Sequence, residues 1–243
     1  MRSAIILASF GSADDSIREK IFDKLAAEIQ EKFPAYELRQ AFTSNFMIKK
    51  LAARGISIST PTEEISKLRN VGFGRIILLP THLTAGEEFD NKIKICAAED
   101  VKIIAPLLSE PIDKKILATI LNCFQKSADE DLILIGHGSP HRHNPVYENL
   151  QKLTGDKIHV GVIEASDTPN FSDVIERLKK SRADKILLAP LLFNGGVHVT
   201  ADIAGGWFNR LTAQGYRVRV IRDGLGSFKK FRELYIEKLE ETI

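Results

Sequence analysis

The sequence predicts an α/β fold of two similar lobes, each a parallel sheet flanked by helices. Short apolar, β-branched runs alternate along the chain with amphipathic segments, which is the pattern of repeated βα units. The strand-like runs are apolar on both faces, as in parallel sheets that helices cover on both sides. The chain also repeats one order of strands, turns and glycines, so the repeating unit is larger than a single βα pair.

The elements follow from local patterns. Runs of mostly apolar, β-branched residues bounded by turn residues predict strands at 4–10, 75–79, 101–104, 132–135, 159–163, 185–189 and 217–221. Apolar residues at helical spacing predict helices at 16–32, 45–54, 62–71, 112–126, 145–153, 172–181 and 203–214. The acidic residues after Gly86 indicate that another short helix begins there.

The internal repeat divides the chain. The first strand ends in ASFGS and a later strand ends in IGHGS, while RIILLP and KILLAP each precede a glycine, Gly86 or Gly196, at the same interval. We therefore predict an N-terminal lobe of residues 1–128 and a C-terminal lobe of residues 129–243. The alignment of the halves places Phe10 opposite His137 and Glu88 opposite His198.

Composition and charge exclude several classes of protein. The chain has 34 Lys and Arg residues and 32 Asp and Glu residues. The resulting net charge of +2 produces no strong positive field that would attract nucleic acid. No apolar run is long enough to cross a bilayer, and the first apolar run is predicted as a strand rather than a leader. We expect a cytoplasmic protein without a membrane partner. Cys96 and Cys123 lack metal-ligand spacing and are expected as reduced thiols.

Candidate metal-handling residues lie at predicted strand ends, where open α/β sheets bind ligands. His137, Glu88, His198 and Glu164 each follow a strand, and we expect a cleft between the lobes to collect them. Imidazole binds divalent first-row metals and accepts protons near neutral pH. The alternatives are local: His137 could hydrogen-bond only to its own turn, and Glu88 could be an acid of a first helical turn.

Other residues are expected to line the same cleft. His82 either faces it or is a satisfied buried histidine, and Ser9 either holds an anion or serves the turn beside Phe10. Gly195 and Gly196 would let a large flat molecule approach the backbone. The remaining candidates are weighed against structural roles: Asp202 orients a histidine or begins a helix, His141 and His143 lie in a polar turn, and His159 is structural.

Six segments of the sequence resemble one family, the class II tetrapyrrole chelatases, and most closely the anaerobic sirohydrochlorin cobalt chelatases known as CbiK. In chain order they are ASFGS, AFTSNFMIKKL, THLTAGEEFD, GHGSPH, VGVIEASDTP and LLFNGGVHVTADIAG. The resemblance implies a two-lobed fold that holds a tetrapyrrole between its lobes. It also implies that His137, Glu164 and His198 handle the metal, with Glu88 as an acid of the catalytic site.

The function that this resemblance implies is insertion of Co²⁺ into sirohydrochlorin on the way to a corrinoid, with no cofactor beyond the substrate metal. Iron or nickel insertion, a non-catalytic tetrapyrrole or metal carrier, and a generic anion-binding protein are the alternatives. Val197 and Ala201 depart from the family, which has an acid and an asparagine there, and the lost acid should weaken the support of His198. Homo-oligomer formation is left open.

Overall fold

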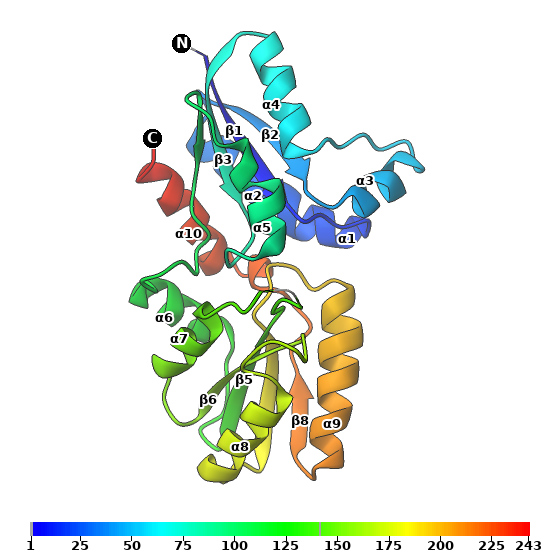
Figure 1. Ribbon diagram of the computed structural model, residues 1–243, viewed down its shortest axis with the longest axis vertical. Helices are drawn as coiled ribbons and strands as arrows, with labels where there is room; N and C mark the ends of the chain where they lie inside the picture. Colours follow the sequence, from blue (N-terminus) through cyan, green and yellow to red (C-terminus); the bar gives the residue numbers. More distant parts are fainter. Residues whose placement is uncertain (1, 141) are drawn as a thin grey trace. The chain divides into compact units, whose positions relative to one another are not determined.

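The computed structural model describes residues 2–140 and 142–243. It forms two compact units, Met1–Leu107 with Arg232–Ile243, and Leu108–Phe231 (Figure 1). The first unit is thus discontinuous along the chain, whereas the boundary expected after residue 128 divides the chain into contiguous halves. Each of the two sheets lies on one side of that boundary.

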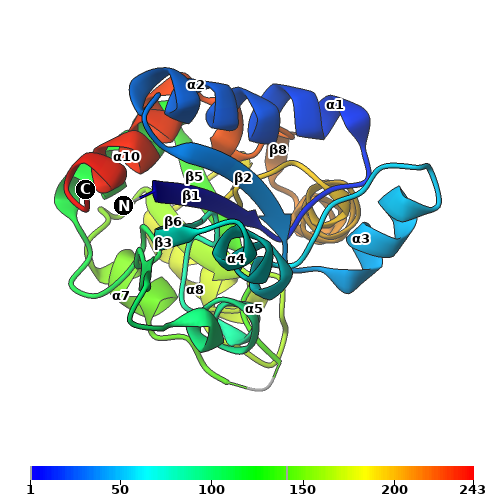
Figure 2. The ribbon, with the colours of Figure 1, turned by 90° about the horizontal axis from the view of Figure 1, so that it is seen from above.

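The first unit contains a four-stranded parallel sheet in the order β2-β1-β3-β4. Its strands are β1 (Arg2–Ser9), β2 (Glu37–Phe42), β3 (Phe73–Pro80) and β4 (Val101–Ile103). Figure 2 shows this sheet between α1 and α2 on one side and α4 and α5 on the other. Its helices are α1 (Asp15–Ile17), η1 (Arg18–Asp23), α2 (Lys24–Lys32), α3 (Asn45–Ala52), α4 (Pro61–Asn70), α5 (Glu87–Lys92), η2 (Lys94–Cys96) and most of α10 (Lys229–Glu240).

The second unit repeats this arrangement with a parallel sheet in the order β6-β5-β7-β8. Its strands are β5 (Glu130–Gly136), β6 (Ile158–Val162), β7 (Lys185–Pro190) and β8 (Arg217–Val220). Its helical segments are α6 (Lys114–Cys123), α7 (Val146–Lys152), α8 (Phe171–Ser181), the π-helix η3 (His198–Trp207), α9 (Phe208–Ala213) and η4 (Leu225–Ser227).

The backbone confirms the internal repeat. The amide of Thr81 donates to the carbonyl of Ala8 over 2.8 Å, and the amide of Leu191 donates to that of Ile135 over 2.7 Å. These pairs occupy the same places in the two sheets, at the ends of β1 and β3 and of β5 and β7. The strand order, the parallel direction and these hydrogen bonds agree, so the predicted α/β fold with two similar parallel sheets is correct.

The core of the second unit explains how η3 is oriented. Val199, Ile203, Trp207 and Leu211 recur every fourth residue along η3 and α9, and all are buried against β5, β7 and α8. Burying this apolar face stabilises the helix against the sheet by the hydrophobic effect. The residues that precede two of them, His198 and Asp202, lie on the more exposed side of the same helix.

The sequence analysis missed some elements. Strand β2 was not predicted, and its first four residues are half-buried or exposed, as expected of a strand at the edge of its sheet. Helix α10 was also missed. The helix predicted at 203–214 begins earlier in the structure, because the π-helix η3 starts at His198. Among the described residues, no helix has the length and apolar character needed to span a bilayer.

Candidate functional site

His137 lies directly beyond the end of β5, in a turn that depends on glycine. The next residue, Gly138, has φ of +75°, a left-handed conformation that residues with a Cβ rarely adopt. A Cβ on Gly138 would also lie 2.9 Å from the Cβ of Val162, so β6 leaves no room for a side chain. The turn leaves the His137 side chain exposed.

Glu164 is held beside this turn by the backbone. Its amide donates to the carbonyl of His137 over 3.0 Å, which continues the pairing of β5 with β6 beyond the ends of both strands. A Cβ on Gly138 would lie 3.1 Å from the Cβ of Glu164, so the glutamate side chain begins next to the turn. His137 and Glu164 therefore come together from neighbouring strands, as the sequence analysis expected of strand ends.

His198 is the first residue of η3 and approaches His137 from the next strand, β7. The two imidazole rings lie edge to face, with centroids 4.6 Å apart and planes at 83°. π-Helical turns are rare, and those that occur are frequently found at functional sites. The structure thus brings together the two histidines that the sequence analysis selected from positions 61 residues apart.

Hydrogen bonds at Nδ1 determine which ring nitrogen of each histidine is available. His137 Nδ1–H donates to the carbonyl oxygen of Gly138 over 3.0 Å, and His198 Nδ1–H donates to Asp202 Oδ2 over 2.8 Å. Because carbonyl and carboxylate oxygens accept, these contacts place the proton of a neutral ring on Nδ1. Each Nε2 then carries a lone pair that can bind a metal ion or accept a proton.

Asp202 supports His198 from within the same helix. Val197 stands where the family has an acid, and the Asp202 carboxylate, four residues along η3, forms the hydrogen bond to Nδ1 of His198; the effect of the acid lost at Val197 stays a prediction. Asp202 lies within the helix rather than in its first turn, so orienting the histidine explains it better than capping. Partners of this kind fix the ring orientation of ligating histidines.

The described residues contain no group of three or more His, Cys, Asp or Glu side chains placed to coordinate a metal ion. Histidines 137 and 198 form a pair, and Glu164 adjoins the pair through the backbone of the first of them. The expected three-residue ligand set of His137, Glu164 and His198 therefore stays a prediction. A pair of imidazoles with free Nε2 atoms is the part of it that the structure assembles.

A second network braces the loops around this pair, and the sequence analysis did not find it. The fully buried carboxylate of Asp167 accepts from the amide of Ser139 over 2.9 Å and from that of Thr168 over 2.8 Å. His143 Nδ1 lies 2.8 Å from the same carboxylate, and Thr168 Oγ1 donates to Glu148 over 2.8 Å. Asp167 thus ties the loop after β5 to the loop after β6.

The candidates of the first unit lie around the ends of β1 and β3. Phe10 is 44% exposed, while Ser9 is buried and its Oγ has no hydrogen-bond partner among the described residues. His82 Nε2 lies 3.5 Å from Thr43 Oγ1, its Nδ1 is buried and unpaired, and burial lowers the pKa of His82 to about 4. His82 is therefore not a fully satisfied histidine, and its place in a ligand cleft stays a prediction.

The repeat shows why the first unit lacks an imidazole pair. The amide of Ser44 donates to the carbonyl of Phe10 over 3.3 Å, as the amide of Glu164 does to His137. Phe10 and Ser44 thus stand where the second unit has His137 and Glu164. Glu88, half-buried as the second residue of α5, aligns with His198 in sequence. In the residues that the structure describes, the paired histidines belong to the second unit alone.

The two glycines of the segment before η3 differ. A Cβ on Gly195 would lie 2.4 Å from the carbonyl oxygen of Arg222, so packing against the chain's own backbone already requires glycine there. Gly196 has only Asn194 Nδ2 nearby, at 3.6 Å. Binding of a flat ligand by these glycines stays a prediction.

The other residues weighed from sequence have mostly structural surroundings. His159 is buried in β6 and bonds to Asp131 over 2.9 Å. Ser12 accepts from the amide of Asp14, a turn contact. Helix α7 begins one residue later than predicted, with Pro145 at its cap. His141 lies outside the described residues, and both cysteines are free, namely Cys96 and Cys123.

Known proteins are similar to this chain in sequence over its whole length. The sirohydrochlorin cobaltochelatase CbiKC of Nitratidesulfovibrio vulgaris is 26% identical and aligns with all of this chain and 91% of its own length. The sirohydrochlorin cobaltochelatase of Salmonella typhimurium is 25% identical, with all of this chain and 97% of the relative covered.

Solved structures agree on the fold. SirB from Bacillus subtilis with Fe³⁺ matches at a TM-score of 0.63 and 14% identity, covering all of this chain and 96% of that one. The sirohydrochlorin chelatase SirB from Bacillus subtilis subspecies spizizenii in complex with cobalt matches at a TM-score of 0.61 and 14% identity. The match covers 100% of this chain and 95% of that one. A family model described as cobalt chelatase (CbiK) matches residues 3–243. The chain therefore belongs to the cobalt chelatase (CbiK) family.

Proposed function

We propose that this protein is a sirohydrochlorin cobaltochelatase, an enzyme that inserts Co²⁺ into the tetrapyrrole sirohydrochlorin. The family and the names of both full-length relatives support this activity. The structural observation that carries the proposal is the His137–His198 pair, whose hydrogen bonds leave both Nε2 atoms with a lone pair. Two imidazoles on neighbouring strand ends suit a divalent first-row metal.

The reaction exchanges protons for a metal ion. A metal-free macrocycle carries two pyrrole N–H protons, and binding of M²⁺ at the four ring nitrogens releases both of them. The protein must therefore present the ion and accept protons. Neutral imidazoles can do both near neutral pH, because their ordinary pKa is about 6.5. We assign delivery of Co²⁺ to the Nε2 atoms of His137 and His198.

The carboxylates complete this assignment. Glu164 supplies negative charge beside the pair and a carboxylate oxygen as the third ligand or as a proton acceptor, while Asp202 holds the ring of His198 in place. Glu88 is assigned as a further proton acceptor, the role that the family resemblance gives it. The tetrapyrrole contacts assigned from sequence are those of Ser9, Phe10, His82, Gly195 and Gly196.

Cobalt is the substrate of this reaction, and no resident cofactor is proposed. Histidine and carboxylate ligands discriminate weakly among Co²⁺, Fe²⁺ and Ni²⁺, so supply of the metal contributes to the choice. The two SirB structures, one with Fe³⁺ and one with cobalt, support the view that the fold itself does not decide it. We place the reaction in the cytoplasm, which the two free cysteines support. Homo-oligomer formation stays a prediction.

An insertion assay tests the proposal. Under anoxic conditions the wild-type protein with sirohydrochlorin and Co²⁺ should change the absorbance of the macrocycle faster than a protein-free control. The double variant His137→Ala, His198→Ala should lose at least about 10²-fold in rate, in the range for removing positioned proton acceptors. Equal rates for the two proteins would refute the assigned role. Competition among Co²⁺, Fe²⁺ and Ni²⁺ in the same assay ranks the metals.

A further inference from the structure

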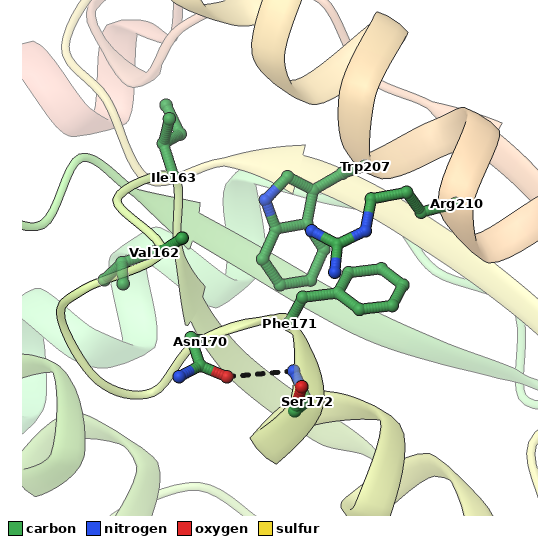
Figure 3. A pocket seen from close by; sticks show the side chains of 8 residues that line it. Val162, Ile163, Asn170, Phe171, Ser172, Trp207 and Arg210 are labelled. Carbon is green, nitrogen blue, oxygen red and sulfur yellow. Dashed lines mark hydrogen bonds between the residues drawn. The ribbon is translucent and has the colours of Figure 1, made fainter.

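A small pocket of about 130 Å³ lies within the second unit, beside the candidate site (Figure 3). One wall is the end of β6 and the following loop, another is the N-terminus of α8, and the third is the junction of η3 with α9. The residues that line it are Val162, Ile163, Ala165, Asn170, Phe171, Ser172, Trp207 and Arg210. A single water needs about 10–15 Å³, so the pocket admits a group of several atoms.

The positive charge of the pocket comes from Arg210. Its guanidinium lies over the ring of Phe171, with the central carbon 3.6 Å from the ring centroid, and Figure 3 shows the two groups stacked. Within residues 2–140 and 142–243, Arg210 makes no ion pair. Stacking on an aromatic ring fixes the plane of a guanidinium while its N–H groups stay available to an anion.

Trp207 supplies a second donor. The indole packs edge-on against Phe171, with ring centroids 5.0 Å apart, and the side chain is 96% buried, since only 4% is exposed. Its Nε1–H donates to no residue in the part of the chain that the structure describes. The Nε1 atom is not itself buried, so this N–H is open to donate to a ligand at the pocket wall.

The N-terminus of α8 is capped by its own side chains. Asn170 Oδ1 accepts from the amide of Ser172 over 2.9 Å, and Asp173 Oδ2 accepts from the amide of Asn170 over 2.8 Å. Arg210 and Trp207 add donors from their side chains, a guanidinium and an indole. The rest of the wall combines aliphatic side chains with the Phe171 ring and the polar Asn170 and Ser172.

The chemistry of the pocket selects its ligand. A guanidinium and an indole N–H are donors without an acceptor, and they match a carboxylate, which only accepts. The aromatic and aliphatic wall suits a short hydrocarbon stem behind that carboxylate. The volume excludes a macrocycle but admits an acetate or propionate group.

The pocket shares two elements with the candidate site. Its lining residues Ile163 and Ala165 flank Glu164, and Trp207 ends the helix that begins at His198. We propose that the pocket binds a carboxylate on a short apolar stem. Resting on the proposed function, we assign that carboxylate to an acidic side arm of the tetrapyrrole, whose acetate and propionate groups have this chemistry.

The single tryptophan of the chain gives a direct test that does not depend on activity. Sodium propionate, added at constant ionic strength, should change the fluorescence of Trp207 in a saturable way, whereas the uncharged isostere propionamide should bind at least tenfold more weakly. Arg210→Gln should raise the Kd for propionate at least tenfold. Arg210→Lys should give a Kd between those of the wild type and Arg210→Gln. Arg217→Gln, which removes an equal charge from an exposed ion pair with Asp184, should match wild type.

Separate outcomes test the carboxylate pocket and its assignment to a tetrapyrrole arm. No saturable change, or equal propionate affinity in wild type and Arg210→Gln, would overturn the carboxylate pocket. If propionate binds but Arg210→Gln leaves the KM for sirohydrochlorin unchanged, the assignment to a tetrapyrrole arm is wrong. The expected result is a KM raised several-fold with kcat unchanged, and competition by propionate. A wild-type protein without insertion activity would refute the proposed function, while the fluorescence titration still decides the pocket.

Discussion

The imidazole rings of His137 and His198 lie edge to face with their centroids 4.6 Å apart. His137 follows β5 in a glycine turn, and His198 begins the π-helix η3 after β7. The buried face of η3 holds this helix against the sheet. Both rings use Nδ1 for hydrogen bonds to neighbouring oxygens. Hydrogen bonds of the protein itself therefore orient the pair, and the orientation can be tested one contact at a time.

Removing the carboxylate that orients His198 should weaken metal binding. Asp202→Asn keeps the size of the side chain but replaces a charged acceptor by an amide, so we expect the Kd for Co²⁺ to rise about 10- to 100-fold. Calorimetric titration with CoCl₂ under anoxia measures it. Asp184→Asn is the matched control, because Asp184 pairs with Arg217 at the surface of the same unit. Equal affinity of Asp202→Asn and wild type would contradict the role of Asp202.

Gly138 should not tolerate a side chain. Gly138→Ala places a Cβ at a φ of +75° and within 2.9 Å of Val162, so we expect a loss of about 1–3 kcal/mol in the free energy of unfolding. Gly155→Ala, in the same unit with nothing within 4 Å of the added Cβ, should leave stability unchanged or slightly higher. Urea unfolding of both variants measures the difference, and equal midpoints would show that the turn is not constrained as described.

The imidazole of His82, whose Nδ1 is buried, should stay neutral well below its ordinary pKa. Burial lowers its pKa from 6.5 to about 4. The stability that this neutral group contributes is present above pH 6.5 and is lost as the pH falls through 6.5 towards 4. NMR titration of the histidine Cε1–H signals, with His82→Asn to assign the resonance, should give a midpoint near 4. A midpoint near 6.5 would contradict the buried environment.

Glu130 should stabilise the second unit in a pH-dependent way. The side-chain hydrogen bond from Arg219 lowers the pKa of Glu130 to about 2, against an ordinary value of 4.5. Its contribution is therefore present above pH 4.5 and fades as the pH falls through 4.5 towards 2. Glu130→Gln should lose about 1–3 kcal/mol of unfolding free energy at pH 7.

The control for this ion pair is Asp129→Asn, which affects the neighbouring exposed pair with Lys185 and should change stability little. Denaturant unfolding at pH 7, 4 and 3 should show the gap between wild type and Glu130→Gln narrowing. A gap that is constant with pH would mean that ionisation of Glu130 does not contribute.

The parts of the fold that were predicted from sequence are those with strong local patterns. The strands that end before His137 and Glu164 are apolar runs bounded by glycine or turn residues. The repeat of ASFGS with IGHGS predicted two equivalent sheets. Strand β2 was missed because its residues alternate poorly at the edge of a sheet. Helix α10 was missed although its Arg232 is buried in a bidentate pair with Glu28, since that partner lies far away in sequence.

Sequence reasoning predicted part of the candidate site, as it predicted part of the fold. His137, Glu164 and His198 stand at strand ends that sequence reasoning could locate. The π-helical start of η3 gave no sequence signal, because the helical periodicity was seen only from residue 203. Asp167 was missed since its bonds to Ser139 and His143 join loops 28 and 24 residues apart. Such contacts depend on how β5 and β6 pair, which no local pattern encodes.

The most direct test of the metal-handling pair is to locate the ion. Crystals of the wild-type protein soaked in Co²⁺ would be measured at the cobalt absorption edge to give an anomalous difference map. We predict a peak about 2.1 Å from Nε2 of both His137 and His198, the usual length of a bond from imidazole nitrogen to a divalent metal. A cobalt peak elsewhere in the protein, with both Nε2 atoms free of the ion, would contradict this account.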